Sequence, residues 1–342
     1  MERLRMRNKL LEIIGLETTF FTDDGQIPAV DHIDFSVHEG EILGIVGESG
    51  SGKSVTSLSI MGLIPSPPGK ITGGEIFLEG RNLAELTDKQ MRKIRGKDVA
   101  MIFQEPMTSL NPLFTIGNQL KEAILIHHPK WSKKKALVRA VEIMKLVGLP
   151  RAEELLKDYP HQLSGGMRQR VMIAMALVCE PKVLIADEPT TALDVTIQAQ
   201  ILQLMKDINK RLNTAVLLIT HDLGVVAETC ERVIVMYAGQ IVEEASVHEI
   251  FNNPLHPYTQ GLIKSVPDMR FKKELLYSIP GTVPKPGTIK VGCRFAERCE
   301  FAMERCTQET PLLYTASEHH KSRCFLLAEQ EVAERDKCAI ES

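Results

Sequence analysis

One glycine-rich loop has the residue types and the spacing that bind a nucleoside triphosphate. The octapeptide GESGSGKS, residues 47–54, fits the pattern G-x-x-x-x-G-K-[ST]. Glycines let successive backbone N–H groups form a nest for phosphate oxygens, and a following helix adds its dipole. A lysine then contacts the β- and γ-phosphates, and a hydroxyl ligates Mg²⁺. The predicted binding residues are Gly47, Ser49, Gly50, Ser51, Gly52, Lys53 and Ser54.

Two adjacent acids follow an apolar run later in the chain. The stretch VLIADEP, residues 183–189, places Asp187 and Glu188 at the end of a predicted strand. An aspartate in this position holds Mg²⁺, directly or through water. A glutamate beside it is suited to orient and activate an attacking water as general base. The alternative is that Asp187 only caps a following helix, but two acids after four apolar residues favour catalysis.

A set of thiols near the end of the chain is the third group of candidate residues. Their separations of five, six and seventeen residues differ from the paired C-x-x-C spacing of common zinc modules. Four thiolates suit either a tetrahedral zinc ion or an iron–sulfur cluster, and metal-free packing stays open as well. Neighbouring arginines are expected to favour the thiolate form. The cysteines are Cys293, Cys299, Cys306 and Cys324, and the arginines are Arg294, Arg298, Arg305 and Arg323.

The segments around these residues alternate between predicted strands and helices. Residues 11–46 are predicted to be rich in strands and to lead directly into the phosphate loop, which a helix at 55–64 follows. After a helical insert at about 105–165, the alternation returns and ends in a hairpin at 232–245. This order predicts an α/β fold with a mostly parallel sheet flanked by helices.

Length and composition favour one large domain with an appendage. The chain has 342 residues, 44% of them hydrophobic and 25% charged, and a net charge of -3. That charge gives no electrostatic case for nucleic acid. We find no apolar run long enough to span a membrane and no secretory signal, so we expect a cytoplasmic chain. Proline and cysteine become frequent near residue 252, which predicts a domain boundary near 255 and loops in NNPLHPYTQGL, residues 252–262.

Six short motifs in order resemble those of the ATP-binding-cassette (ABC) ATPases. The resemblance covers roughly residues 10–255, and the motifs span about 175 residues of it. It implies a P-loop NTPase cassette, with a mixed sheet core, an antiparallel β subdomain and a helical subdomain, that hydrolyses ATP with Mg²⁺. The motifs are the phosphate loop at 47–54, FQEP with Gln104, LSGGMRQR at 163–170, the acids at 183–188, TALD with Asp194 and ITHDL with His221.

The resemblance also implies a role for each matched residue. Glu188 would be the general base. His221 would contact the γ-phosphate and hold the catalytic geometry around Glu188. Gln104 would sense Mg²⁺ and the attacking water. Asp194 would organise a facing site, and Phe20 is the candidate to stack on adenine ahead of the phosphate loop.

The motif at 163–170 predicts a second anion site that another chain completes. Ser164, Gly165 and Gly166 are expected at the start of a helix, where backbone N–H groups attract phosphate. In the family resembled, this site meets the γ-phosphate bound by the other cassette. The resemblance therefore implies a head-to-tail dimer with two ATP molecules between its subunits, and leaves open whether the partner is a second copy or a paralogue.

Longer stretches are similar to the ATP-binding subunits of the oligopeptide/dipeptide importer group. They are VGESGSGKSVTSLSIMGL, FQEPMTSLNP, THDLGVVAE and NNPLHPYTQGL. This resemblance implies two transmembrane permease subunits that dock near TSLNP at 108–112, an extracytoplasmic solute-binding protein, and a peripheral position on the cytoplasmic face of the membrane. Peptides are the expected solute. Nickel or another small solute, and a non-transport cassette regulator, stay open as alternatives.

Residues 256–342 are similar to the C-terminal extension of the same group. Some of its members carry a four-iron four-sulfur cluster at four cysteines spaced in this way. The resemblance therefore implies a 4Fe–4S cluster at the four cysteines named above, whereas thiol count and spacing alone do not choose between metals.

Overall fold

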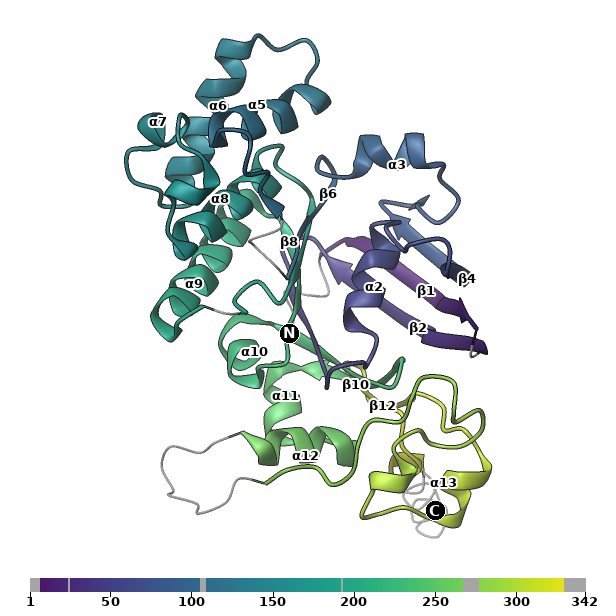
Figure 1. The fold of residues 1–342 in the computed structure, drawn as a ribbon. Helices are drawn as coiled ribbons and strands as arrows, with labels where there is room; N and C mark the ends of the chain where they lie inside the picture. The colour runs from purple at the N-terminus through teal and green to yellow at the C-terminus, as the bar shows by residue number, and fades with distance from the viewer. Residues whose placement is uncertain (1–6, 24, 105–108, 192, 267–276, 329–342) are drawn as a thin grey trace.

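Two β-sheets form the body of the molecule in the computed structural model (Figure 1). The structure describes residues 7–23, 25–104, 109–191, 193–266 and 277–328. Within these ranges the larger sheet has eight strands in the order β11-β12-β10-β9-β3-β8-β7-β6, and the smaller has four in the order β2-β1-β4-β5. The predicted combination of a mixed core sheet and an antiparallel subdomain is therefore confirmed.

Parallel strands form the centre of the larger sheet. All residues of β3, β7 and β8 are buried, which explains why each is a continuous apolar run rather than an alternating one. β10 returns antiparallel to β9, so the hairpin predicted at 232–245 is confirmed. The strands are β3 (Ile42–Val46), β6 (Val99–Ile102), β7 (Val183–Asp187), β8 (Ala215–Ile219), β9 (Arg232–Tyr237), β10 (Gln240–Ser246), β11 (Tyr314–Ser317) and β12 (His320–Ser322).

The smaller sheet is antiparallel and packs beside the core sheet. Its central strand β1 pairs with β2 on one side and β4 on the other. Leu11 and Leu16 of β1 share one buried apolar cluster with Leu43 and Ile45 of β3. This cluster joins the two sheets next to the phosphate loop. The strands are β1 (Lys9–Thr22), β2 (Gly25–His38), β4 (Gly69–Leu78) and β5 (Arg81–Asn82).

A group of helices lies at the end of the molecule opposite the C-terminal segment (Figure 1). Leu120, Ala140 and Ile143 belong to one buried cluster with residues of the longer helices beside the core sheet. Thr115 and Ser132 cap the first two helices through their hydroxyls. Helices thus occupy the insert predicted at about 105–165. The helices of the insert are α5 (Ile116–His127), α6 (Lys133–Leu146) and α7 (Ala152–Leu155). The longer helices beside the core sheet are α8 (Gly165–Leu177), which begins where the insert ends, and α9 (Val195–Leu212).

Shorter helices complete the described part of the chain. The sequence predicted the helix after the phosphate loop but not the one between β5 and β6. None of the helices in the described ranges combines the length and the apolar character needed to cross a membrane. They are α2 (Lys53–Ile60), α3 (Asp88–Ile94), α10 (Leu223–Thr229), α11 (Val247–Asn252), α12 (Pro257–Ser265) and α13 (Glu304–Gln308), with 3-10 turns at Pro160–Gln162 and Ala296–Arg298.

The prediction of loops throughout residues 252–262 was wrong, because α12 begins at Pro257. Proline is favoured in the first turn of a helix, where its missing N–H has no partner to lose. His256 precedes it and caps the helix, since its Nδ1 accepts the N–H of Tyr258 at 3.1 Å. The proline that suggested a loop therefore marks the start of a helix whose first side chains are buried.

The C-terminal segment continues the core sheet. β12 pairs antiparallel with β10, and Glu243 and Glu244 lie opposite Ser322 and Lys321. The N–H of Arg323 extends this pairing with a 2.8 Å hydrogen bond to the carbonyl of Val242. Residues far beyond 255 thus supply strands to the same sheet as the phosphate loop. The division into domains at 10–255 and 256–342 stays a prediction.

Candidate nucleotide-binding and catalytic site

The phosphate loop connects β3 to α2 in a conformation that requires glycine. Gly47 and Gly52 have φ angles of +152° and +102°. A Cβ atom at Gly47 would lie 2.2 Å from the carbonyl oxygen of Met236, and one at Gly52 would lie 2.6 Å from that of Ala29. The loop therefore packs directly against the backbone of β2 and β9, and a side chain at either position would force it open.

Lys53 lies over this loop, in the place that the motif predicted. Its Nζ donates to the carbonyl oxygens of Gly47 at 2.8 Å and Glu48 at 2.9 Å. Burial lowers the pKa of Lys53, although Glu188, Asp187 and Glu48 act in the opposite direction. A buried ammonium group beside a nest of loop N–H groups is a site for a strongly negative ligand.

Ser54 and Asp187 are brought together at the end of β7. The Ser54 hydroxyl donates to Oδ1 of Asp187 at 3.1 Å. Burial raises the pKa of Asp187, and the charge of Glu188 adds to the rise. A divalent cation would offset both effects, and a hydroxyl with a carboxylate is the kind of oxygen ligand set that Mg²⁺ takes. The two residues therefore fit the predicted Mg²⁺ site.

Glu188 accepts three side-chain hydrogen bonds. Its Oε2 accepts from Nε2 of Gln104 at 3.0 Å and from the Thr191 hydroxyl at 3.0 Å, while His221 Nδ1 lies 3.2 Å from Oε1. Burial opposes ionisation of Glu188, but the hydrogen bonds from His221 and Thr191 outweigh it, so its pKa is lowered. The side chain is thus an oriented carboxylate at neutral pH, as a general base must be.

The predicted catalytic residues therefore converge from three separate parts of the chain. Gln104 follows β6, Glu188 follows β7 and His221 follows β8, and the carboxyl ends of parallel strands meet at one edge of the sheet. Thr191 is the residue that sequence reasoning missed. The signal was present, because Thr191 is the first residue of TALD and stands three positions after Glu188.

The start of α8 remains apart from the phosphate loop. Ser164 caps this helix by accepting the N–H of Met167 at 3.3 Å. Ser164 and Gly165 are exposed, and a Cβ atom at Gly165 would meet nothing within 4 Å. In the described part of the chain no hydrogen bond joins Ser164, Gly165 or Gly166 to residues 47–54, so a single chain leaves this anion site open.

Two further predicted residues lie outside the catalytic cluster. Asp194 caps α9, because its Oδ1 accepts the N–H of Ile197 at 3.0 Å, and the residue is exposed. Phe20 lies on β1, opposite Ile27 and Gly69 in the smaller sheet, and is half-buried. Their roles toward a facing site and toward adenine stay predictions.

Comparison with known proteins decides the family. Residues 30–191 match the family model described as ABC transporter, and residues 242–306 match the one described as oligopeptide/dipeptide transporter, C-terminal region. The oligopeptide transport ATP-binding protein AppD of Bacillus subtilis (strain 168) is 57% identical over 94% of this chain and 98% of its own. The chain belongs to the ABC transporter ATP-binding proteins. It is an ABC ATPase of the group that carries the oligopeptide/dipeptide C-terminal region.

Other relatives of this ABC ATPase agree with that assignment. The dipeptide transport ATP-binding protein DppD of Bacillus subtilis (strain 168) is 51% identical over 93% of this chain and 95% of its own. Among solved structures, a dimeric ATP-binding cassette in a post-hydrolysis state with ADP and Pi is similar with a TM-score of 0.63. It is 30% identical and covers 70% of this chain and 99% of its own.

The four cysteines of this ABC ATPase line one narrow pocket, together with the rings of Phe295 and Phe325. Among the described residues, no three of their sulfur atoms lie within 4.8 Å of one another. A zinc ion with Zn–S bonds of about 2.3 Å would need closer sulfurs. The described residues therefore do not show a preformed zinc geometry at these thiols, and the predicted 4Fe–4S cluster stays a prediction.

The expectation that neighbouring arginines favour the thiolate form was wrong for Cys293 and Cys324. Burial raises the pKa of Cys293 to about 11 and that of Cys324 to about 12. The arginines do not offset this, because Arg294 and Arg298 turn away from the pocket to Asp31 and Glu48. The prediction relied on the closeness of these arginines to the cysteines in sequence, whereas in the fold Arg294 and Arg298 pair with acids outside the pocket.

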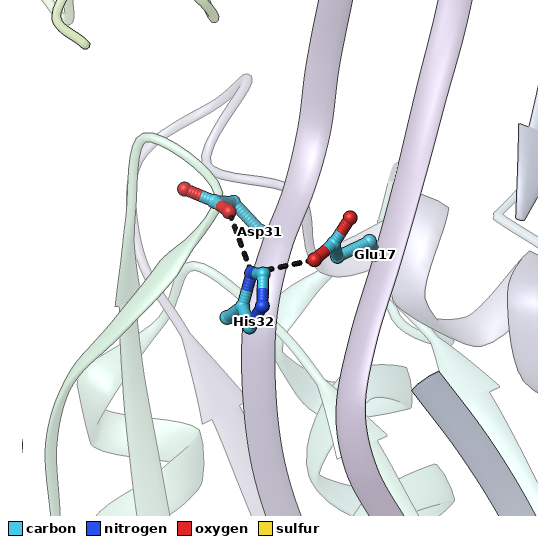
Figure 2. A group of neighbouring side chains, drawn as sticks. All are labelled: Glu17, Asp31 and His32. Carbon is cyan, nitrogen blue, oxygen red and sulfur yellow. Dashed lines mark hydrogen bonds and ion pairs between the residues drawn. The ribbon is translucent and has the colours of Figure 1, made fainter. Parts of the chain in front are cut away.

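A cluster of Glu17, Asp31 and His32 also has ligand atoms close to one another (Figure 2). His32 Nδ1 lies 2.6 Å from Oε1 of Glu17 and 3.2 Å from Oδ1 of Asp31. The other carboxylate oxygen of Asp31 accepts from Arg294 and Gln240. These contacts already satisfy the polar atoms, so ion pairing between β1 and β2 accounts for the cluster without a metal.

Proposed function

We propose that this chain is the ATP-hydrolysing subunit of a peptide importer, and that it works as one of two cassettes beneath two permease subunits on the cytoplasmic face of the membrane. The observation that carries the chemistry is the set of hydrogen bonds that orient Glu188 next to Asp187, Ser54 and Lys53. The relatives named for oligopeptide and dipeptide transport support the peptide as solute.

In this proposal the residues divide the work of phosphoryl transfer to water. Lys53 and the loop N–H groups bind the phosphates, and Ser54 with Asp187 would hold Mg²⁺, which supplies charge neutralisation at the phosphates. Glu188 accepts the proton of the attacking water. Gln104 and His221 keep its carboxylate in place, because each donates to a different oxygen.

The exposed start of α8 supports a pair of cassettes. Ser164 and Gly165 present backbone N–H groups to solvent, and Val195, next to Asp194, has 83% of its surface exposed. Val195 is apolar and highly exposed, and it lies next to a residue predicted to face the other chain. Such a side chain is expected to be covered when the cassettes assemble. A second cassette would cover both and close the γ-phosphate site.

A groove between the core and the helical region supports docking of a permease. Its volume is about 350 Å³, and apolar side chains dominate its lining, as is usual for a binding groove. Ser109, part of the predicted TSLNP contact, also lines the groove, whereas Thr108 of that contact lies outside the described residues. Its lining includes Met61, Leu63, Met101, Phe103, Met172 and Met175.

Replacing Glu188 by Gln tests the catalytic part of this proposal. The amide keeps the shape and most hydrogen bonds but cannot accept the proton, so we expect ATP binding to persist while turnover falls by at least about 100-fold. Size-exclusion chromatography with MgATP should then show a lasting dimer of cassettes. Unchanged ATPase activity in Glu188→Gln would refute the assignment of the base.

The intact complex tests the transport part. Purification from membranes should bring permease subunits with the chain, and vesicles reconstituted with that complex should take up a labelled dipeptide only with ATP. Uptake of Ni²⁺ in place of peptide would show that the solute is nickel, the alternative stated above. Recovery with ribosomes or DNA and without permeases would instead support a non-transport regulator.

We propose the iron–sulfur cluster as a separate cofactor for the cysteine pocket. What supports it is that four thiols from separate positions, one buried and three half-buried, line the same pocket. Protein purified without oxygen should be brown and contain iron and sulfide. A colourless protein with one zinc ion, or with no metal, would reject the cluster.

A further inference from the structure

The C-terminal segment contacts the phosphate loop directly at Glu48. This residue is the second of the loop, and the guanidinium group of Arg298 binds its carboxylate with both terminal nitrogens, at 2.8 and 3.1 Å. The backbone N–H of Glu48 donates to the hydroxyl of Tyr258 at 2.8 Å. Side chain and backbone of one loop residue are therefore bound by two residues that lie beyond the predicted boundary at 255.

Arg298 is fixed in this position by contacts of its own. Its side chain is only 5% exposed, and its Nε donates to the carbonyl of Pro280 at 2.8 Å. One terminal nitrogen lies 3.2 Å from the Tyr237 hydroxyl, and the guanidinium carbon lies 5.8 Å from the centre of the Phe295 ring. A buried, preorganised arginine that binds a carboxylate with two nitrogens makes a strong and directional ion pair.

A second arginine of the same segment reaches the other side of the loop. Arg294 donates to the carbonyl of Ala238 and to Asp31, the carboxylate that Figure 2 shows beside His32. The next residue, Gly239, donates its N–H to the carbonyl of Ser51 in the loop at 2.9 Å. The segment from 293 to 299 thus touches the loop at Glu48 and supports the turn that touches Ser51.

The charge of Glu48 explains why this contact matters. A carboxylate in a phosphate-binding loop repels a triphosphate, and Glu48 also acts on Lys53, whose ammonium group donates to the carbonyl of Glu48. Paired with Arg298, the carboxylate is neutralised and turned toward the C-terminal segment. Without that partner it would compete with the phosphates for Lys53.

We propose that Arg298 is a positioning residue for ATP binding, which neutralises Glu48 and fixes the phosphate loop from the C-terminal segment. This inference rests on the proposed ATP site at residues 47–54. It gives the C-terminal segment a part in the ATPase reaction itself, through a contact that does not depend on what occupies the cysteine pocket.

The test replaces Arg298 by Met in the full chain and measures kcat and KM for ATP. We expect KM to rise about tenfold or more, because truncating one partner of a buried charge pair leaves the other unpaired, while kcat changes little. Adding Glu48→Gln should return KM to within about twofold of the Glu48→Gln single variant, since the charge to be neutralised is then absent. Arg298→Lys, which keeps the charge but loses the two-pronged geometry, should lie between the parent and Arg298→Met.

Arg305→Met is the matched control. Arg305 flanks another cysteine of the same pocket, is 46% exposed and pairs with Glu309, the residue that follows its helix, so KM should not change. An unchanged KM in a folded Arg298→Met variant would overturn the proposal, as would a raised KM that Glu48→Gln fails to correct. If Arg298→Met does not fold, the comparison of Arg298→Lys with and without Glu48→Gln decides in the same way.

Lys53→Met separates this proposal from the one on which it rests. If Lys53→Met abolishes binding of a fluorescent ATP analogue but Arg298→Met leaves binding and KM unchanged, only the role of Arg298 is lost. If Lys53→Met binds the analogue normally, the phosphate loop is not the ATP site and the proposed function falls with it.

Discussion

The starts of α2 and α8 are the two predicted phosphate sites, but the described residues surround only the first with partners from other parts of the chain. At α2, Lys53 bonds to the loop, Ser54 bonds to Asp187, and Tyr258 and Arg298 contact Glu48. At α8, the cap of Ser164 is local and the helix start is exposed. One chain thus holds a finished half-site at α2 and an open half-site at α8, which supports the proposal that a second cassette completes the site.

Replacing Lys53 by Met should have the largest effect at the finished half-site. The apolar stem still fills the buried space, but the loss of a charged hydrogen-bond donor should weaken ATP binding by about 3 kcal/mol, more than 100-fold. Equilibrium titration of the purified chain with a fluorescent ATP analogue measures this. The comparison fails if Lys53→Met loses turnover and keeps its affinity.

Replacing Gly165 by Asp at the open half-site should lower turnover and leave ATP affinity unchanged, whereas Lys53→Met lowers the affinity itself. An acid in the first turn stabilises a helix, and nothing crowds this position, so folding and ATP affinity should stay unchanged. Turnover should fall by about 100-fold, because the added charge repels the phosphate of the facing chain. Gly165→Asn, which has the same size without the charge, should lose less. Equal losses in both variants would mean that bulk, not charge, blocks the site.

Acid should lower the stability of the folded chain through His256, which caps the start of α12 next to Tyr258, a contact of the finished half-site. Burial lowers the pKa of His256 to about 4, so below pH 6.5 the unfolded chain binds a proton that the folded chain does not. The contribution of neutral His256 to stability is therefore fully present above pH 6.5. The free energy of unfolding should fall by about 2 kcal/mol between pH 7 and pH 5. Urea unfolding at the two pH values measures this loss. His256→Asn keeps a cap acceptor without titrating, and an equal acid loss in that variant would assign the effect to other groups.

Asp194 gives the smallest effect and separates capping from a role toward the facing chain. Asp194→Ala should cost about 1 kcal/mol of stability, because α9 loses its cap. Asp194→Ser should restore that stability in thermal unfolding. If turnover returns with stability, Asp194 only caps the helix. If stability returns and turnover does not, the carboxylate acts across the dimer, as the sequence resemblance implies.

The sequence predicted the residues of the catalytic cluster but not the residues that support it. Gln104, Glu188 and His221 each stand in a short motif, and parallel strands bring such motifs to one edge of the sheet. Arg298 lies in no motif, Tyr258 lies in a stretch that indicated only the importer group, and each is more than 200 positions from Glu48 in the chain. Only packing of the C-terminal segment brings them together, so local pattern could not reveal them. The raised thiol pKa values escaped prediction for the same reason, because burial is a property of the fold.

The pairing of β12 with β10 also sets an order on synthesis. β10 is complete at residue 246, but the strand that covers its edge begins at His320, which also adds a hydrogen bond to the buried carboxylate of Glu243. At about 5–20 residues per second, the nascent chain carries an uncovered strand edge for several seconds. The C-terminal hairpin therefore closes the cassette late, and a chain released early would expose an edge prone to pair with other chains.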